Sequence, residues 1–117
     1  KLDLSNFEKV SLDDMENILL EAKDNDAPEI KIFKAIAFIH KIETSPQVDQ
    51  GIILSLLDRI ENHLRSVIDE LDDEMDDAIN EQLELSKENQ LKIEELKTNY
   101  SKIKKALMLI KNIRFSL

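Results

Sequence analysis

Apolar residues recur at steps of three and four along most of the chain, the spacing that places side chains on one face of an α-helix. The residues that interrupt such a pattern are few, namely Pro28, Pro46 and the single glycine, Gly51. The pattern predicts four helices over about residues 12–24, 28–43, 46–85 and 90–115. We expect them to form a single all-α domain of residues 1–117.

Both prolines stand where a new helix is expected to begin. Ser11, Asp26 and Ser45 precede the first three predicted helices, and their side-chain oxygens are of the kind that caps a helix N-terminus. Pro28 and Pro46 follow in the first turn, where proline is tolerated. The second helix is apolar around most of its circumference, so we expect it to be the most buried element.

The chain after Pro46 carries a heptad seam, in which apolar residues alternate steps of three and four. The seam slips after Leu71, resumes at Ile93, and is weakest between Glu84 and Gln90. Such a seam predicts coiled-coil packing against another helix. Its members are Ile53, Leu57, Ile60, Leu64, Val67 and Leu71 before the slip, and Ile93, Leu96, Tyr100, Ile103, Leu107 and Ile110 after it.

Two arrangements satisfy this seam. A continuous helix of about 70 residues would be roughly 105 Å long at about 1.5 Å per residue. A helical hairpin turning near Lys87–Glu88 would instead lay the acidic stretch 69–77 beside the basic stretch 99–107. We favour the hairpin, and hence an elongated helical bundle with a long antiparallel, coiled-coil-like hairpin and two shorter N-terminal helices. A domain-swapped homodimer through residues 60–113 makes the same contacts between chains and stays open.

The predicted hairpin is much longer than the two N-terminal helices, so part of it is expected to project. We expect those helices to cover its 46–65 end and to leave residues 70–100 as a two-helix stalk. Apolar seam residues on the stalk would then be available to a partner protein. The candidate partner-binding surface is Met75, Ile79, Leu83, Leu85, Ile93, Leu96 and Tyr100.

Composition excludes several classes of protein. Hydrophobic residues make up 42% of the chain and charged residues 35%, which is too apolar for a disordered tail and too charged for a membrane span. The absence of cysteine removes disulfides and thiolate metal sites, but it does not settle the compartment. We expect a soluble protein, with the cytoplasm slightly favoured and secretion open. Because the sequence begins with Lys1, we expect a processed form or a piece of a longer protein.

The net charge of −9 is unevenly distributed along the sequence. Acidic residues fill seven of the nine positions Asp69–Asp77, whereas residues 91–117 are basic. The acidic run has neither the ligand spacing nor the glycine bend of a Ca²⁺ loop, so we interpret it as a solvated face opposite the basic residues. Basic segments bind nucleic acids or membrane surfaces, but the strongly acidic remainder of the chain opposes both partners. The expected acidic face is Asp69, Asp72, Asp73, Asp76 and Asp77.

The chain offers little material for catalysis. Its two histidines, His40 and His63, lack the Glu-x-x-His spacing of a di-iron bundle, because neither has a glutamate three residues before it. A phosphotransfer role for His40 is opposed by Glu43, whose charge would repel a phosphoryl group. No serine lies in a glycine-flanked elbow. We expect no enzymatic activity, no cofactor and no metal site.

These observations favour a non-catalytic helical module that binds or assembles with another protein through a coiled-coil surface. Two alternatives stay open. One is a small acidic regulator or inhibitor that acts through its acidic face, and the other is a helical component or chaperone of a secretion apparatus. The identity of the protein partner does not follow from the sequence.

Overall fold

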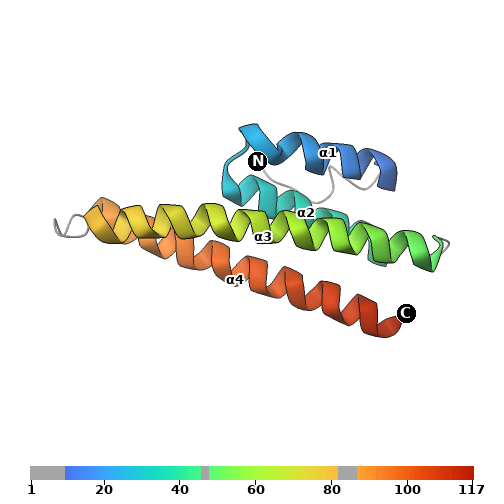
Figure 1. Ribbon diagram of the computed structural model, residues 1–117. Helices are drawn as coiled ribbons and strands as arrows, with labels where there is room; N and C mark the ends of the chain where they lie inside the picture. The colour runs from blue at the N-terminus through green and yellow to red at the C-terminus, as the bar shows by residue number, and fades with distance from the viewer. Residues whose placement is uncertain (1–9, 46–47, 82–86) are drawn as a thin grey trace.

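The computed structural model describes residues 10–45, 48–81 and 87–117, and the side chains of residues 20–25 and 81 lie outside this description. Four helices account for almost all of these residues (Figure 1). They are α1 (Leu12–Asn25), α2 (Pro28–Glu43), α3 (Gln50–Glu81) and α4 (Lys87–Ser116). No strand occurs in the described ranges, and the prediction of an all-α helical bundle is confirmed.

The two long helices, α3 and α4, lie against each other and run in opposite directions (Figure 1). At one end, the side-chain amide of Gln50 in the first turn of α3 donates to the carbonyl of Leu117, just after α4, at 2.7 Å. Farther along the pair, the hydroxyl of Tyr100 on α4 donates to the carboxylate of Asp72 on α3. The start of α3 therefore lies beside the end of α4.

The chain reverses direction before α4 begins. Lys87 and Glu88, where the sequence predicts the turn, already lie in the first turn of α4. Helix α3 ends at Glu81, and residues 82–86 lie outside the described residues. The bundle measures 54 × 28 × 20 Å, about half the length of one continuous helix over the same segment.

Helix α2 packs against α1, α3 and α4 and forms the centre of the core (Figure 1). Phe38 and Ile39 are 1% and 0% exposed, so this nearly all-apolar helix is deeply buried, as expected. The facing seam residues are equally covered, since Leu71 of α3 is 0% and Ile103 of α4 is 1% exposed. Burying each such side chain stabilises the fold by about 1.5–3 kcal/mol. The largest fully buried side chains are Met15, Ile32, Phe38, Ile39, Leu57, Ile60, Leu64, Val67, Leu71, Ile103 and Ile110.

The N-cap predicted for α1 is confirmed, but the one predicted for α2 is wrong. Ser11 caps α1 as predicted, because its hydroxyl accepts the backbone N–H of Asp14 at 3.2 Å. Asp26 does not cap α2, which starts from Ala27 without a side-chain cap. The Asp26 carboxylate instead accepts a bond from the Lys34 ammonium at 2.7 Å. In this bond both donor and acceptor are charged, whereas in a cap bond only the carboxylate would be.

The predicted start of the third helix near residue 46 is wrong, because α3 begins at Gln50. Ser45 does not cap it. The Ser45 hydroxyl donates to the carbonyl of Lys41 at 2.7 Å and so satisfies an open acceptor at the end of α2. The carbonyl of Asp49 accepts the first backbone bond of α3 at 3.0 Å. Pro46, the other predicted start signal, lies outside the described residues.

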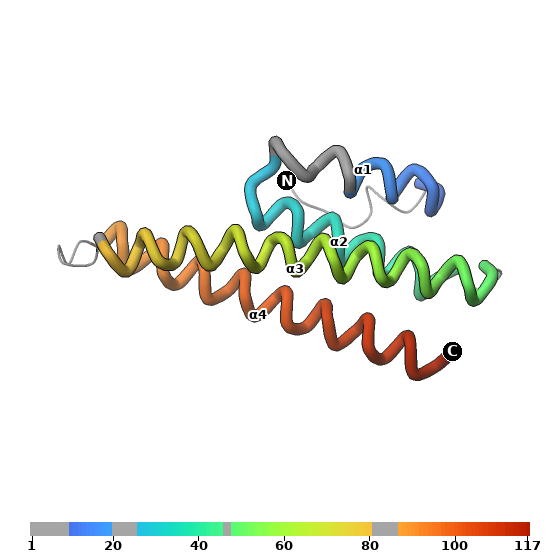
Figure 2. Tube along the Cα trace, viewed as in Figure 1, coloured from blue at the N-terminus to red at the C-terminus, as the bar shows by residue number. Residues whose placement is uncertain are grey.

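Helix α2 covers more of the long pair than helix lengths alone predict. Lys31 of α2 is only 6% exposed and pairs with Glu70 of α3 at 2.9 Å. Still farther along, Pro28 lines a groove together with Glu74 and Leu96. The expectation that α1 and α2 leave residues 70–100 uncovered is therefore wrong at Glu70, Glu74 and Leu96, which lie beside α2. The C-terminal part of α3 and the N-terminal part of α4 still project beyond α2 (Figure 2).

Placing a charge in the buried seam tests this core. Leu71→Asp or Ile103→Asp should lower the free energy of unfolding by about 3–5 kcal/mol, because each puts an unpaired carboxylate in an apolar site. Leu91→Asp is the matched control: Leu91 is 64% exposed on α4, and its replacement should cost less than about 0.5 kcal/mol. Urea denaturation followed by circular dichroism measures all three variants. Equally small losses for the buried and exposed positions would contradict this core.

Candidate functional site

Three helix ends surround a groove at the end of the bundle where α2 ends and α3 begins. This end groove has a volume of about 590 Å³. It lies between the last turn of α2, the first turn of α3 and the C-terminal turns of α4. Its apolar lining consists of Ile42, Val48, Ile53, Leu109, Ile113 and Leu117, and its polar lining of Glu43, Ser45, Gln50, Asn112 and Ser116.

The end groove exists because α4 diverges from α3 toward its C-terminus (Figures 1 and 2). Helix α1 packs against α2 and leaves most of α4 uncovered within the described residues. The apolar side chains of Leu109 and Ile113 are consequently only half-buried, although they belong to a helix whose inner face is fully covered. The 2.7 Å bond between Gln50 and Leu117 closes one side of the groove.

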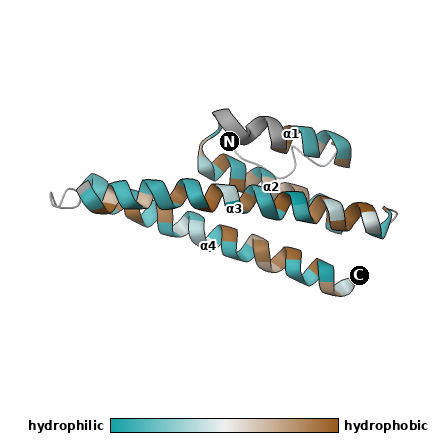
Figure 3. Cartoon of the chain, viewed as in Figure 1, coloured by the Kyte–Doolittle hydropathy of each residue, from teal (hydrophilic) through white to brown (hydrophobic). Residues whose placement is uncertain are grey.

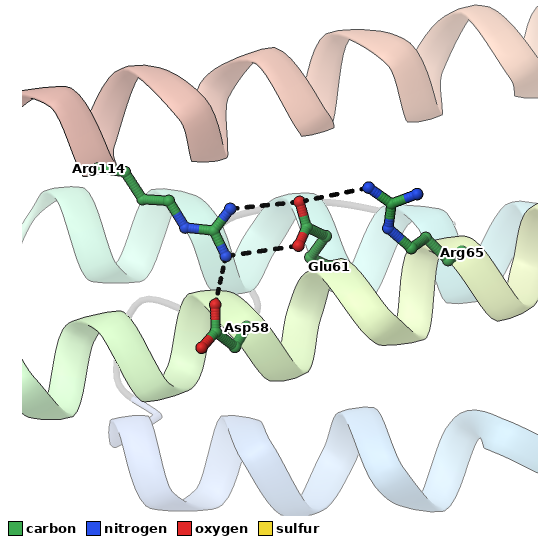
Figure 4. Close-up of polar contacts among 4 residues, drawn as sticks. All are labelled: Asp58, Glu61, Arg65 and Arg114. Carbon is green, nitrogen blue, oxygen red and sulfur yellow. Dashed lines mark hydrogen bonds and ion pairs between the residues drawn. The ribbon is translucent and has the colours of Figure 1, made fainter.

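A cluster of charged residues joins the same part of α4 to α3 (Figure 4). The guanidinium of Arg114 donates to the carboxylate of Glu61 at 3.2 and 3.5 Å and also binds Asp58. These bonds raise the pKa of Arg114 above its ordinary value, with the bond to Glu61 as the largest cause. Arg65 lies 3.8 Å from the same Glu61 carboxylate. The cluster fixes the C-terminal part of α4 on α3, so the end groove has a defined shape.

Large apolar side chains are exposed next to the lining of the end groove. Phe115 is 83% exposed, and Leu117 is 42% exposed. Ile52, on the first turn of α3, is 53% exposed. Leu117 lines the groove, whereas Phe115 and Ile52 are chain neighbours of lining residues. The ends of both long helices that form the groove thus carry exposed apolar side chains, and exposed apolar surface of some extent is typical of binding sites.

The described members of the binding surface predicted on the stalk differ in exposure. Leu96 is 3% exposed and belongs to the core, because α2 reaches as far as this residue. Met75, Ile93 and Tyr100 are half-buried against the core. Only Ile79, at 51%, is exposed among the members that the structure describes. Leu83 and Leu85 lie outside the described residues.

The sequence does contain a signal for the end groove. Hydrophobic ribbon recurs along the C-terminal half of α4 (Figure 3). Residues 106–110 form an unbroken apolar run there, and Phe115 follows shortly after it. Such a run covers more of the helix circumference than packing against one neighbour requires. The surplus falls on Met108, which is 56% exposed, and on Leu109 in the groove.

The acidic face is exposed, as expected, and the bond from Tyr100 to Asp72 shows that its stretch of α3 lies beside the basic stretch of α4. Within stretches 69–77 and 99–107, however, no direct ion pair joins the two helices, and Glu70 pairs with Lys31 of α2 instead. The two stretches therefore face each other as solvated surfaces. The exposed aspartates are Asp69, Asp72, Asp73, Asp76 and Asp77.

Tyr100 provides the polar contact between α3 and α4 in this region. Its hydroxyl donates to Asp72, and its ring is half-buried. Partial burial, followed by the bond to Asp72 and the charges of Asp72 and Asp76, raises the pKa of Tyr100 above its usual 10.0. The folded state thus favours the protonated phenol. The associated stability is fully present below pH 10 and is lost as the pH rises through the folded-state pKa.

The raised pKa of Tyr100 can be measured directly, because the chain has one tyrosine and no tryptophan. Absorbance at 295 nm should show ionisation above pH 10 in the folded protein and near the usual 10.0 in urea. Asp72→Asn should lower the folded value, because it removes the charged acceptor. Asp73→Asn, on the same helix, is the control and should leave it unchanged. Ionisation at the same pH in the folded and unfolded chains would contradict the contact.

The histidines occupy unrelated environments. His40 is exposed on α2, with its Nδ1 3.8 Å from a carboxylate oxygen of Glu43. His63 is buried on α3 and is 9% exposed. In the part of the chain that the structure describes, no group of three or more histidine, aspartate or glutamate side chains is placed to hold a metal ion.

Comparison with protein-family models, with curated proteins and with solved structures finds no match to this chain. Among the described helices, none has a stretch that is both long enough and apolar enough to cross a lipid bilayer. The function therefore has to be inferred from the surface of the bundle.

Proposed function

We propose that this chain is a non-catalytic helical module that binds another protein through its end groove. The observation that carries the proposal is the apolar groove of about 590 Å³ between the ends of α2, α3 and α4, together with the exposed apolar side chains beside it. A groove between helices accepts apolar side chains at helical spacing from a partner helix.

The surroundings of the end groove favour a protein partner over a small molecule. A small-molecule site encloses most of its ligand, whereas Leu117 lines this groove and is itself 42% exposed. Asn112 and Ser116 supply polar groups at its margin. An apolar centre with a polar rim is the usual arrangement of a protein interface.

Charged substitutions at the end groove test this function. Leu117→Asp and Phe115→Asp should each reduce partner capture from a native extract at least about tenfold, because each puts a carboxylate where an apolar contact is expected. Leu91→Asp is the control, since Leu91 is equally apolar, 64% exposed and on the opposite end of α4. Cross-linking mass spectrometry identifies the captured protein and the residues that touch it.

The result contradicts the proposal if the captured protein binds Leu117→Asp as well as it binds wild type. Equal loss for Leu117→Asp and Leu91→Asp would also contradict it, because binding would then follow general surface charge rather than the groove. Circular dichroism of each variant verifies that the bundle remains folded.

The exposed acidic face supports a second candidate, the binding of a basic partner. Its carboxylates are free to attract cationic side chains, which speeds association and gives specificity. The same extract experiment tests it through the variant in which Asp72, Asp73, Asp76 and Asp77 are changed to Asn. Capture that survives this change but not Leu117→Asp assigns binding to the end groove alone.

A further inference from the structure

The pair α3–α4 has an outer face, on the side away from α2, that carries a basic patch. A groove of about 350 Å³ lies there between the two helices, and only residues of α3 and α4 line it. Its apolar lining residues are Leu107 and Met108. Its remaining lining residues are Arg65, Lys104, Lys111, Arg114 and Glu61.

Two cations of the basic patch remain available to a partner. Arg114 and Arg65 already lie against Glu61. Lys104 and Lys111 are exposed and form no ion pair with any described residue. They are seven residues apart, which places them on one side of α4 at a separation of about 10 Å. Met108, which is 56% exposed, lies between them in sequence.

The same outer face carries an acidic patch farther along α3. Asp69, Asp72, Asp76 and Ile79 follow Arg65 at steps of four, three, four and three, so they share its side of the helix. The bond from Tyr100 to Asp72 shows that this side adjoins α4. The three aspartates are exposed, and Ile79 is 51% exposed.

Each patch therefore combines an exposed apolar side chain with unpaired charges of one sign. The acidic patch has Ile79 beside Asp72 and Asp76. The basic patch has Met108 beside Lys104 and Lys111. The two patches are opposite in charge and alike in having an apolar centre, so each is a complementary surface for the other.

We propose that two copies of this chain associate through their outer faces, with the acidic patch of each copy against the basic patch of the other. A symmetric dimer requires this kind of self-complementary face, because every contact from one copy to the other is made twice. Ile79 of one copy then contacts Met108 of its partner copy. Lys104 and Lys111 receive the carboxylates of the partner copy's acidic patch.

The dimer is expected to be weak and sensitive to salt. Most of its contacts join exposed charges, whose attraction is screened over about 10 Å at 0.1 M salt. Few apolar groups are buried, so affinity depends on charge pairing more than in an apolar interface. The dimer surface does not include the end groove, and therefore the two proposals can fail separately.

Charge-reversal variants of the full chain test the dimer. Asp69→Lys with Asp76→Lys makes the acidic patch net basic, and Lys104→Glu with Lys111→Glu replaces the two available cations of the basic patch with carboxylates. Each double variant should be monomeric at low salt, with dimerisation weakened at least about tenfold, because like charges then face each other. An equimolar mixture of the two should form a one-to-one dimer, since every opposed charge pair is restored. Sedimentation equilibrium measures all three samples and wild type.

A control variant tests whether charge reversal at positions off the outer face affects dimerisation. Asp77→Lys with Lys102→Glu changes the same residue types at exposed positions off the outer face, and it should dimerise like wild type. Leu117→Asp should also dimerise normally, which separates this surface from the end groove. Thermal melting verifies that each variant is folded.

Three results would overturn the proposed dimer. The first is a wild-type chain that stays monomeric at low salt and high concentration. The second is a wild-type dimer that neither double reversal weakens, which would place self-association on another surface. The third is an equimolar mixture of the two reversed variants that remains monomeric, because complementary faces would then fail to bind.

Discussion

The burial of α2 is the constraint on which the rest of the structure depends. This helix is apolar around most of its circumference, so it is stable only when other helices cover it on several sides. Phe38 and Ile39 reach 1% and 0% exposure because α1, α3 and α4 all pack against the same short helix. Even Lys31 is buried on it, and the bond of 2.9 Å to Glu70 stabilises its charge there.

The end groove follows from covering a short helix with two longer ones. Helix α2 ends at Glu43, whereas α4 continues to Ser116 and diverges from α3 as it does so. Apolar residues that would lie between helices elsewhere in the bundle then have solvent on one side. The contact of Gln50 with Leu117 and the bonds of Arg114 join α3 to α4 at this end and so give the groove a fixed shape. The packing that buries α2 thereby leaves apolar surface exposed at this end.

Sequence periodicity predicted the helices and the seam but not the surfaces. Leu71 and Ile103 are buried as their spacing indicates, since the steps of three and four report directly on one helix face. Asp26 and Ser45 do not cap the helices that follow them, because the side chain of each is hydrogen-bonded to another group. The stalk surface failed at Leu96 because coverage depends on how far α2 reaches, which no local pattern encodes. The divergence of α4 is likewise set by packing among distant residues.

The distance between the two ends that form the groove tests this account most directly. Spin labels at Asp49→Cys and Phe115→Cys can be placed selectively, because the chain has no cysteine. In a sample diluted with unlabelled protein, pulsed electron resonance should give one short distance, as the 2.7 Å bond between Gln50 and Leu117 requires. A continuous helix would separate the labels by roughly 100 Å. A distance near that value would contradict the antiparallel pair of α3 and α4. Loss of the short distance on dilution would contradict it within one chain, because the two ends would then meet only between chains.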